Sequence, residues 1–149
     1  MSQSILNTLR EEHRHIEGIL VQIQACNEIV EKKSLYLQLE EELVPHMSGE
    51  EKTIYQHLMK DVHDEEAEDV AQRSINEHKV IKDLIARLDN IGIESDEWDS
   101  TFRKLNETIK KHIKEEERVL FSEAKVDFSL EELVEFGEEF IEVKQHLSL

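Results

Sequence analysis

Residues that make turns and crosslinks are scarce in this sequence. Its 149 residues include four glycines and one proline, which leaves little material for the turns of a β-sheet protein. Cys26 is the lone cysteine, so no disulfide framework is possible, and a reducing cytoplasm is the expected location. No apolar run approaches the roughly 18 residues that mark a membrane-spanning helix. The first six residues also lack the basic start and apolar core of a signal peptide.

Positive charge is also in short supply. The 18 lysines and arginines face 35 aspartates and glutamates, which gives a formal net charge of −17. Such a charge repels phosphate groups and therefore argues against nucleic-acid partners and against anionic membrane surfaces. Charged residues make up 36% of a chain rich in Glu, Lys, Leu and Ile, a composition typical of long helices. The length predicts one domain, residues 1–149.

The sequence contains an internal repeat. Residues 46–55 and 112–121 align at a shift of 66, and each segment begins with His-x-x-x-Glu-Glu and ends with an aromatic residue, Tyr55 or Phe121. The same shift aligns Tyr36 with Phe102. Residues 12–23 and 77–88 align at a shift of 65, and each begins with Glu-His. The chain therefore consists of two copies of a helix pair.

The spacing of apolar residues predicts an all-α protein, an antiparallel up-down-up-down four-helix bundle with a short fifth helix at the C-terminus. The bundle is expected over about residues 4–124 and the last helix over about 129–146. The first helix is expected over residues 4–30, the second begins after a cap at Ser34, and turns follow at 61–64 and 90–95.

Two features refine this outline. Pro45 is expected to bend the second helix just before His46, because proline removes a backbone donor. Ser129-Leu-Glu-Glu132 is typical of a capping box that opens the last helix. The side chains of that helix expected to pack across the bundle are Leu133, Phe136, Phe140 and Ile141.

Four histidines and two glutamates occupy positions on the apolar seams where leucine would be expected. Residues four apart share a helix face, so His-x-x-x-Glu projects two donors into the interior. Two carboxylates in a dry core are costly unless a cation lies between them, and no lysine or arginine lies on these seams. The set predicts a metal site: His13, His46, Glu50, His78, His112 and Glu116. Mixed nitrogen and oxygen donors suit iron, with zinc or manganese still open. The alternative is a bundle whose polar core residues only set the helix register.

These motifs together resemble the hemerythrin HHE cation-binding family, from about Ile5 to Phe121. The resemblance implies a four-helix bundle with a non-haem di-iron centre, its two iron ions joined by an oxo or hydroxo bridge when oxidised. It also implies that the six residues above are the ligands and that Glu50 and Glu116 bridge the two ions.

The ligand set is similar to one branch of that family. Oxygen-carrying hemerythrins have a second histidine on the third helix, whereas the positions four residues from His78 are Ser74 and Lys82. The set of four histidines and two glutamates is similar to that of the RIC (repair of iron centres) proteins. With four protein donors each, both irons keep open positions, which favours reaction with O2, NO or peroxide over reversible carriage of O2.

Three functions are compatible with this reading. The first is a role in oxidative or nitrosative stress or in iron-centre repair, which implies a protein partner with iron–sulfur clusters. The second is an O2- or NO-binding or sensing module without turnover, and the third is a di-iron oxidase or peroxidase-like enzyme. His57 and Glu123 are expected to form a polar pair on a route for protons or iron, or else to be solvated at helix ends. Glu51 and Glu117 fall outside the seams and are expected to face solvent.

Overall fold

The structure is a computed structural model that describes residues 2–147, and these residues form helices and no strand. In chain order the elements are α1 (Ile5–Ala25), α2 (Ile29–Lys52), α3 (Ile54–Lys60), α4 (Glu65–Asp89), α5 (Asp96–Glu115), the π-helical turn η1 (Glu116–Leu120), α6 (Phe121–Asp127) and α7 (Leu130–Leu147).

Each of the four long helices begins at a side chain that accepts hydrogen bonds from its own first turn. Ser4 caps α1 and Asp64 caps α4 in this way, while Glu28 accepts from two backbone N–H groups of α2 and Ser95 from one of α5. These contacts satisfy donors that a helix start leaves without partners. The capping residues therefore fix where the bundle helices start.

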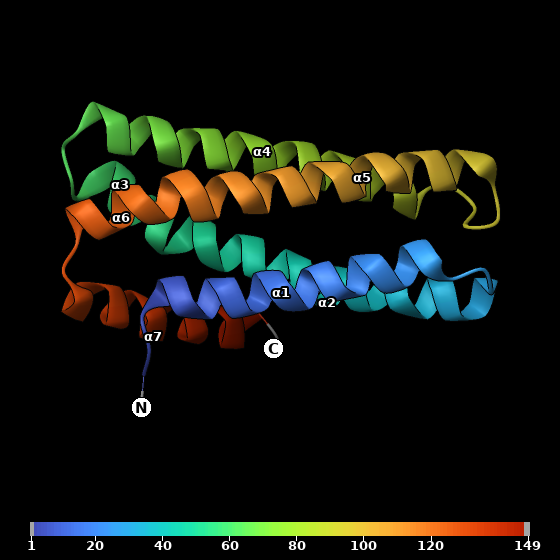
Figure 1. Cartoon of the computed structure of the whole chain (residues 1–149), viewed down its shortest axis with the longest axis horizontal. Helices are drawn as coiled ribbons and strands as arrows, with labels where there is room; N and C mark the ends of the chain where they lie inside the picture. Colours follow the sequence, from blue (N-terminus) through green and yellow to red (C-terminus); the bar gives the residue numbers. More distant parts are fainter. Residues whose placement is uncertain (1, 148–149) are drawn as a thin grey trace.

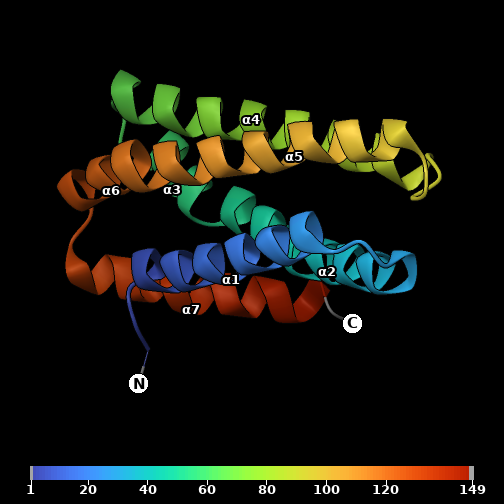
Figure 2. The same cartoon turned by 45° about the vertical axis from the view of Figure 1, so that its right-hand side comes forward.

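The helices form the expected antiparallel up-down-up-down bundle (Figure 1). Its first arm is α1 and its third arm is α4. The second arm is α2 followed by α3, and the fourth is α5 followed by η1 and α6. The fifth helix, α7, lies outside the bundle and contacts α1 and α2, as both views show (Figures 1 and 2). Within residues 2–147 no helix combines the length and the apolar character needed to cross a membrane.

The buried apolar residues form two separate clusters along the bundle. One cluster, which includes Ile16, Leu39 and Trp98, lies toward the end that carries the turn 26–28 and the loop 90–95, here called the loop end. The other includes Leu9 and Phe140 and lies toward α7. The predicted metal ligands fall between the two clusters along every arm of the bundle.

The predicted boundary between the first two helices is wrong. α1 ends at Ala25, Cys26 is extended, and α2 begins at Ile29 with Glu28 as its cap. Val30 is 75% exposed and is not on a seam. Asn27 and Val30 continue the apolar spacing only by coincidence, and Glu28 is not among the residue types that usually cap helices. Ser34 therefore lies inside α2.

Of the remaining helix predictions, some are confirmed and others are wrong. Pro45 lies within α2 without ending it, and the interruption comes at Thr53, whose backbone angles are φ −121° and ψ −95°. The capping box is confirmed, because the Ser129 and Glu132 side chains each accept from the other's backbone N–H. Leu133, Phe136 and Phe140 are buried as predicted, whereas Ile141 is 47% exposed and the prediction that it packs is wrong.

Candidate metal centre

The structure brings all six predicted metal ligands together in the middle of the bundle. His13 comes from α1, His46 and Glu50 from α2, His78 from α4, His112 from α5 and Glu116 from the start of η1. None of the six is more than 5% exposed. Residues far apart in the sequence thus form one buried cluster between the two apolar clusters.

The six side chains form two groups of four donors that share both glutamates. One group is His13, His46, Glu50 and Glu116, and the other is His78, His112, Glu50 and Glu116. Glu50 Oε1 lies 3.2 Å from Nε2 of both His46 and His78. Glu116 lies 3.1 Å from His13 Nε2 and 3.4 Å from His112 Nε2. Each carboxylate therefore contacts one histidine of each pair.

Several of these atoms are buried without a hydrogen-bond partner. Among the residues described, His13 Nε2, both carboxylate oxygens of Glu50 and Glu116 Oε1 make no hydrogen bond. His78 Nε2 and His112 Nε2 face each other at 3.2 Å. A buried polar atom without a partner costs roughly 1–3 kcal/mol, and more when charged. Buried nitrogen and oxygen atoms that face one common space without hydrogen-bond partners are suited to binding a cation.

A carboxylate stands behind each histidine. The Nδ1 atoms pair with Glu117 for His13, Glu12 for His46, Glu51 for His78 and Glu77 for His112, at distances of 2.7, 2.7, 2.7 and 2.5 Å. Such a bond fixes the ring orientation and turns Nε2 toward the centre. The expectation that Glu51 and Glu117 only face solvent is wrong. The repeat did contain the signal, because each of the four glutamates adjoins a predicted ligand in the sequence.

Basic side chains contact three of these four carboxylates. Lys144 of α7 donates to Glu12, Arg14 donates to Glu117, and Lys82 donates to Glu51 at 2.9 and 3.0 Å. Burial acts to raise the pKa of Glu12, but its hydrogen bonds with His46 and Lys144 outweigh it and lower that pKa. The pKa of Glu51 is lowered in the same way, because its hydrogen bonds with His78 and Lys82 outweigh the effect of burial. Both carboxylates are therefore held charged behind their imidazoles.

The electrostatics of the cluster favour positive charge at its centre. Burial alone would lower the pKa of His46, but Glu50 and Glu12 raise it to about 10. Burial likewise opposes the shift at His112, whose pKa Glu116 and Glu77 raise to about 10. Both pKa shifts favour a proton on the imidazoles of His46 and His112, and a bound metal ion would take the place of such protons.

Both glutamates lie beside an interruption of their helix. The backbone leaves α geometry at Thr53, three residues after Glu50, and Thr53 Oγ1 donates to the Gly49 carbonyl at 2.7 Å. In the second copy the π-helical turn η1 begins at Glu116. Single π-helical turns within α-helices are frequent at functional sites. Neither interruption was predicted from the apolar spacing.

The sequence analysis also missed Tyr55. This fully buried residue of α3 donates its hydroxyl to Glu116 Oε2. The Tyr55 hydroxyl oxygen also lies 3.2 Å from His78 Nε2. Burial and the charges of Glu116 and Glu50 raise the pKa of Tyr55. The repeat aligns Tyr55 with Phe121, which has no hydroxyl. The added hydroxyl was the one available signal.

α7 covers the His46 side of the centre. The Phe140 ring meets the His46 ring edge-on, with 6.1 Å between the centroids. Gly49 permits this approach, because a Cβ there would lie 2.5 Å from Phe140 Cε1. The last helix therefore closes one side of the cluster.

His57 and Glu123 do not form the predicted pair. His57 bonds instead to Asp61 at 2.6 Å and to Glu139 at 3.0 Å, and it stacks on Phe136. Glu123 bonds to Asp127, which with burial raises the pKa of Glu123 to about 7. The interruption at Thr53 changes the phase of α3, so the helical register that linked Glu50 to His57 does not continue.

Comparisons with known proteins agree with this geometry. A family model described as the hemerythrin HHE cation-binding domain matches residues 4–124. The crystal structure of a hemerythrin HHE cation-binding domain-containing protein, an Rv2633c homologue from Mycobacterium kansasii, superposes with a TM-score of 0.83 at 21% identity. That match covers 98% of this chain and 87% of that chain.

Two curated proteins are also similar. An uncharacterized hemerythrin-like protein of Schizosaccharomyces pombe is 25% identical over 76% of this chain and 56% of its own length. A protein of Nostoc sp. strain PCC 7120 named DNA nickase is 22% identical over 97% of this chain and 40% of its own length. The chain thus spans about half or less of each curated relative. The family match over most of its length nevertheless shows that the chain belongs to the hemerythrin HHE cation-binding family.

Proposed function

We propose that the buried cluster holds two iron ions and that the protein reacts with O2, NO or peroxide. The observation that carries this proposal is the sharing of Glu50 and Glu116 by two four-donor groups. Two ions would each have a pair of histidines, His13 with His46 and His78 with His112, and the two carboxylates would bridge them. A mixed nitrogen and oxygen donor set suits iron.

The buried atoms without partners support a resident metal rather than a purely structural polar core. Side chains that only set helix register would satisfy one another, whereas both oxygens of Glu50 are left without a hydrogen bond among the described residues. Iron held by these six residues would supply the electrons for reaction with a small oxidant. Glu12, Glu51, Glu77 and Glu117 orient the imidazoles and balance the charge.

The absence of a fifth histidine favours reaction with a small oxidant over reversible carriage of O2. Lys82 points to Glu51 at the surface, and Ser74 is a buried side chain too short to reach the centre as a histidine would. Tyr55 instead offers a hydroxyl oxygen beside His78 and Glu116. Two ions held here would each have two histidines, and neither would have a third.

We also propose a physiological setting for this chemistry. We favour a role in oxidative or nitrosative stress or in the repair of iron centres, with an iron–sulfur protein as the partner and a reducing cytoplasm as the location. An oxidase or peroxidase-like enzyme is the second candidate, and the buried Tyr55 hydroxyl beside the centre favours it. We do not extend the name of the Nostoc relative to this chain, because the chain spans 40% of that protein and carries a net charge of −17.

The test is anaerobic purification followed by metal counting and visible spectroscopy with O2, NO and peroxide. Two irons per chain that oxidise irreversibly in O2 and bind NO when reduced would support the proposal. A stable and reversible O2 band would make the protein a carrier. A folded protein that takes up no metal, even when unfolded and refolded with ferrous iron, would overturn the proposal. Steady turnover of peroxide would favour the enzyme.

A further inference from the structure

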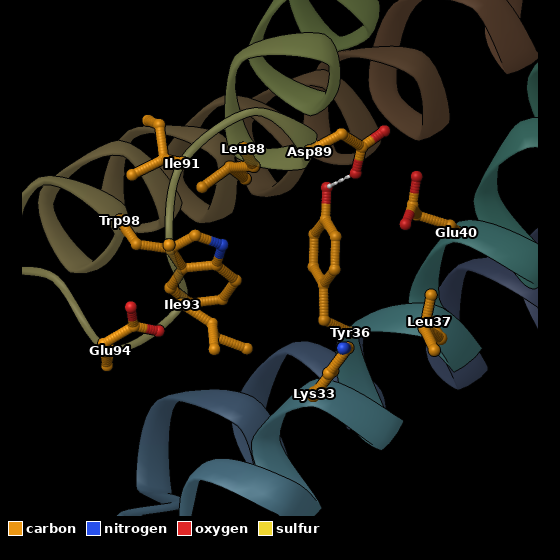
Figure 3. A pocket seen from close by; sticks show the side chains of 11 residues that line it. Lys33, Tyr36, Leu37, Glu40, Leu88, Asp89, Ile91, Ile93, Glu94 and Trp98 are labelled. Atoms are coloured by element: carbon orange, nitrogen blue, oxygen red, sulfur yellow. Dashed lines mark hydrogen bonds between the residues drawn. The ribbon is translucent and has the colours of Figure 1, made fainter.

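A second candidate site lies at the loop end of the bundle, away from the metal centre. A cavity of about 520 Å³ opens between α2, the end of α4 and the loop 90–95 (Figure 3). Ligand pockets commonly have volumes of about 300–1,000 Å³. Tyr36, Trp98 and Ile93 supply apolar walls, and Glu40 and Asp89 supply carboxyl groups at one side. The cavity therefore joins an apolar surface to a concentrated negative charge.

The two carboxyl groups lie close together, and within the described part of the chain neither forms an ion pair with a basic side chain. Tyr36 crosses the cavity and donates its hydroxyl to Asp89 Oδ1 at 3.1 Å, and Glu40 lies on the same side of the Tyr36 ring as Asp89 (Figure 3). Burial and the neighbouring Asp89 raise the pKa of Glu40 to about 7. Lys33 also lines the cavity, but among residues 2–147 no ion pair joins it to either carboxyl group. A positive charge placed here would relieve the repulsion between the two acids.

The internal repeat supplies a control for this pair within the same molecule. At the shifts found in the sequence, Glu40 aligns with Asn106, Asp89 with Gln24 and Tyr36 with Phe102. At the equivalent place between α5 and α1, the Asn106 amide donates to Gln24 Oε1 at 3.3 Å, and both line a smaller cavity of about 190 Å³. The fold thus accommodates a neutral amide pair at this place. The acidic pair is not a requirement of the bundle.

The equivalent cavity also differs in how it is closed. Lys32 and Asp99 both line it and form an ion pair at 2.6 Å. The residues that align with them line the first cavity and are Trp98 and Lys33, which cannot form an ion pair with each other. The first cavity therefore stays larger and keeps its negative charge exposed to a ligand.

We propose that the cavity at the loop end binds a small organic cation, a protonated amine attached to an apolar group. The ammonium group would lie between Glu40 and Asp89, and the apolar group would lie against Tyr36, Trp98 and Ile93. Charge complementarity sets the sign of the ligand, and the aromatic rings add attraction for a cation. This site is independent of the metal centre and of its function.

Trp98 provides a direct test, because it is the one tryptophan of the chain and lines the cavity. We would titrate the full chain with 2-phenylethylammonium at pH 8 and follow tryptophan fluorescence. The neutral 2-phenylethanol, which has the same apolar group, is the matched ligand. We expect a saturable change with the amine and at least about ten-fold weaker binding of the alcohol. No saturable change, or equal affinity for both ligands, would overturn the proposal.

Two variants locate the binding. Exchanging the acids for the amide pair of the equivalent cavity, Glu40→Asn with Asp89→Gln, should raise the Kd for the amine at least about ten-fold. The Kd for the alcohol should stay unchanged. Glu40→Gln alone should give a smaller loss and serves if the double variant unfolds. Glu41→Gln removes the same charge at an exposed neighbouring position and should leave the Kd unchanged. Unaltered amine affinity in a folded Glu40→Gln variant would refute the site.

Discussion

Glu51 joins His78 to the protein surface: its Oε2 lies 2.7 Å from His78 Nδ1, and Lys82 donates to both of its oxygens. The same arrangement recurs for His46, through Glu12 and Lys144. The imidazoles of His78 and His46 are thus each held by a carboxylate that is itself bound by a lysine. Metal retention should therefore depend on residues that are not ligands.

Glu51→Ala should weaken metal binding by about 10–100-fold, the usual cost of removing a carboxylate that orients a ligand histidine. Competition with a chelator, monitored by metal content, measures the change. Glu41→Ala is the control, since Glu41 is exposed on the same helix. Equal chelator resistance in the two variants would show that Glu51 does not orient His78.

Gly49→Ala and Gly18→Ala should have opposite effects on stability. A methyl group at Gly49 collides with the Phe140 ring, whereas nothing lies within 4 Å of one at Gly18. We expect Gly49→Ala to lower the free energy of unfolding by about 1–3 kcal/mol. Gly18→Ala should raise it by about 0.5–1 kcal/mol, because glycine is unfavourable within a helix. Urea unfolding measures both, and stabilisation by Gly49→Ala would mean that α7 does not pack as described.

Tyr55→Phe should destabilise the metal-free protein by about 1.5–3 kcal/mol, because it removes a buried hydrogen bond to a carboxylate. The change leaves the aromatic ring in place, as Phe121 does in the second copy, so the fold should persist. Urea unfolding of the metal-free protein gives the loss of stability. The visible spectrum of the iron-loaded variant should also change. A variant identical in both measurements would place the hydroxyl outside the centre.

The stability of the wild-type protein should contain a contribution from Glu40 that falls as the pH rises from about 4.5 to 7. The folded state raises the pKa of Glu40 from 4.5 to about 7, so it binds the proton more tightly than the unfolded chain does in this interval. Stability declines wherever the folded state binds more protons. Urea midpoints at pH 5 and pH 7.5 should differ less in Glu40→Gln than in Glu41→Gln. The same pH dependence in both variants would contradict the assignment.

The repeat explains why the metal cluster could be predicted from the sequence. His46-x-x-x-Glu50 and His112-x-x-x-Glu116 each follow helical periodicity over a single turn, where register errors do not accumulate. The ends of helices are harder to predict, because Glu28 caps α2 through a local hydrogen bond that apolar spacing does not encode.

Contacts between distant segments escaped prediction for another reason. Glu51 and Glu117 lie off the apolar seams, and their roles depend on which neighbouring helix presents a histidine to them. Tyr55 reaches the centre only because the helix is interrupted at Thr53, and the same interruption removes His57 from the predicted position. Backbone irregularities of this kind have no periodic signature in the sequence.

The sharing of donors between the two copies of the helix pair has an evolutionary consequence. Each copy supplies both histidines of one group, and each supplies one glutamate to both groups. The supporting bonds also cross, since Glu117 of the second copy holds His13 of the first and Glu51 of the first holds His78 of the second. A single helix pair contains half of the donors, so two copies of one hairpin would supply a complete set. Duplication and fusion of such a hairpin gene would then preserve the centre while freeing each half to diverge, as Tyr55 and Phe121 have done.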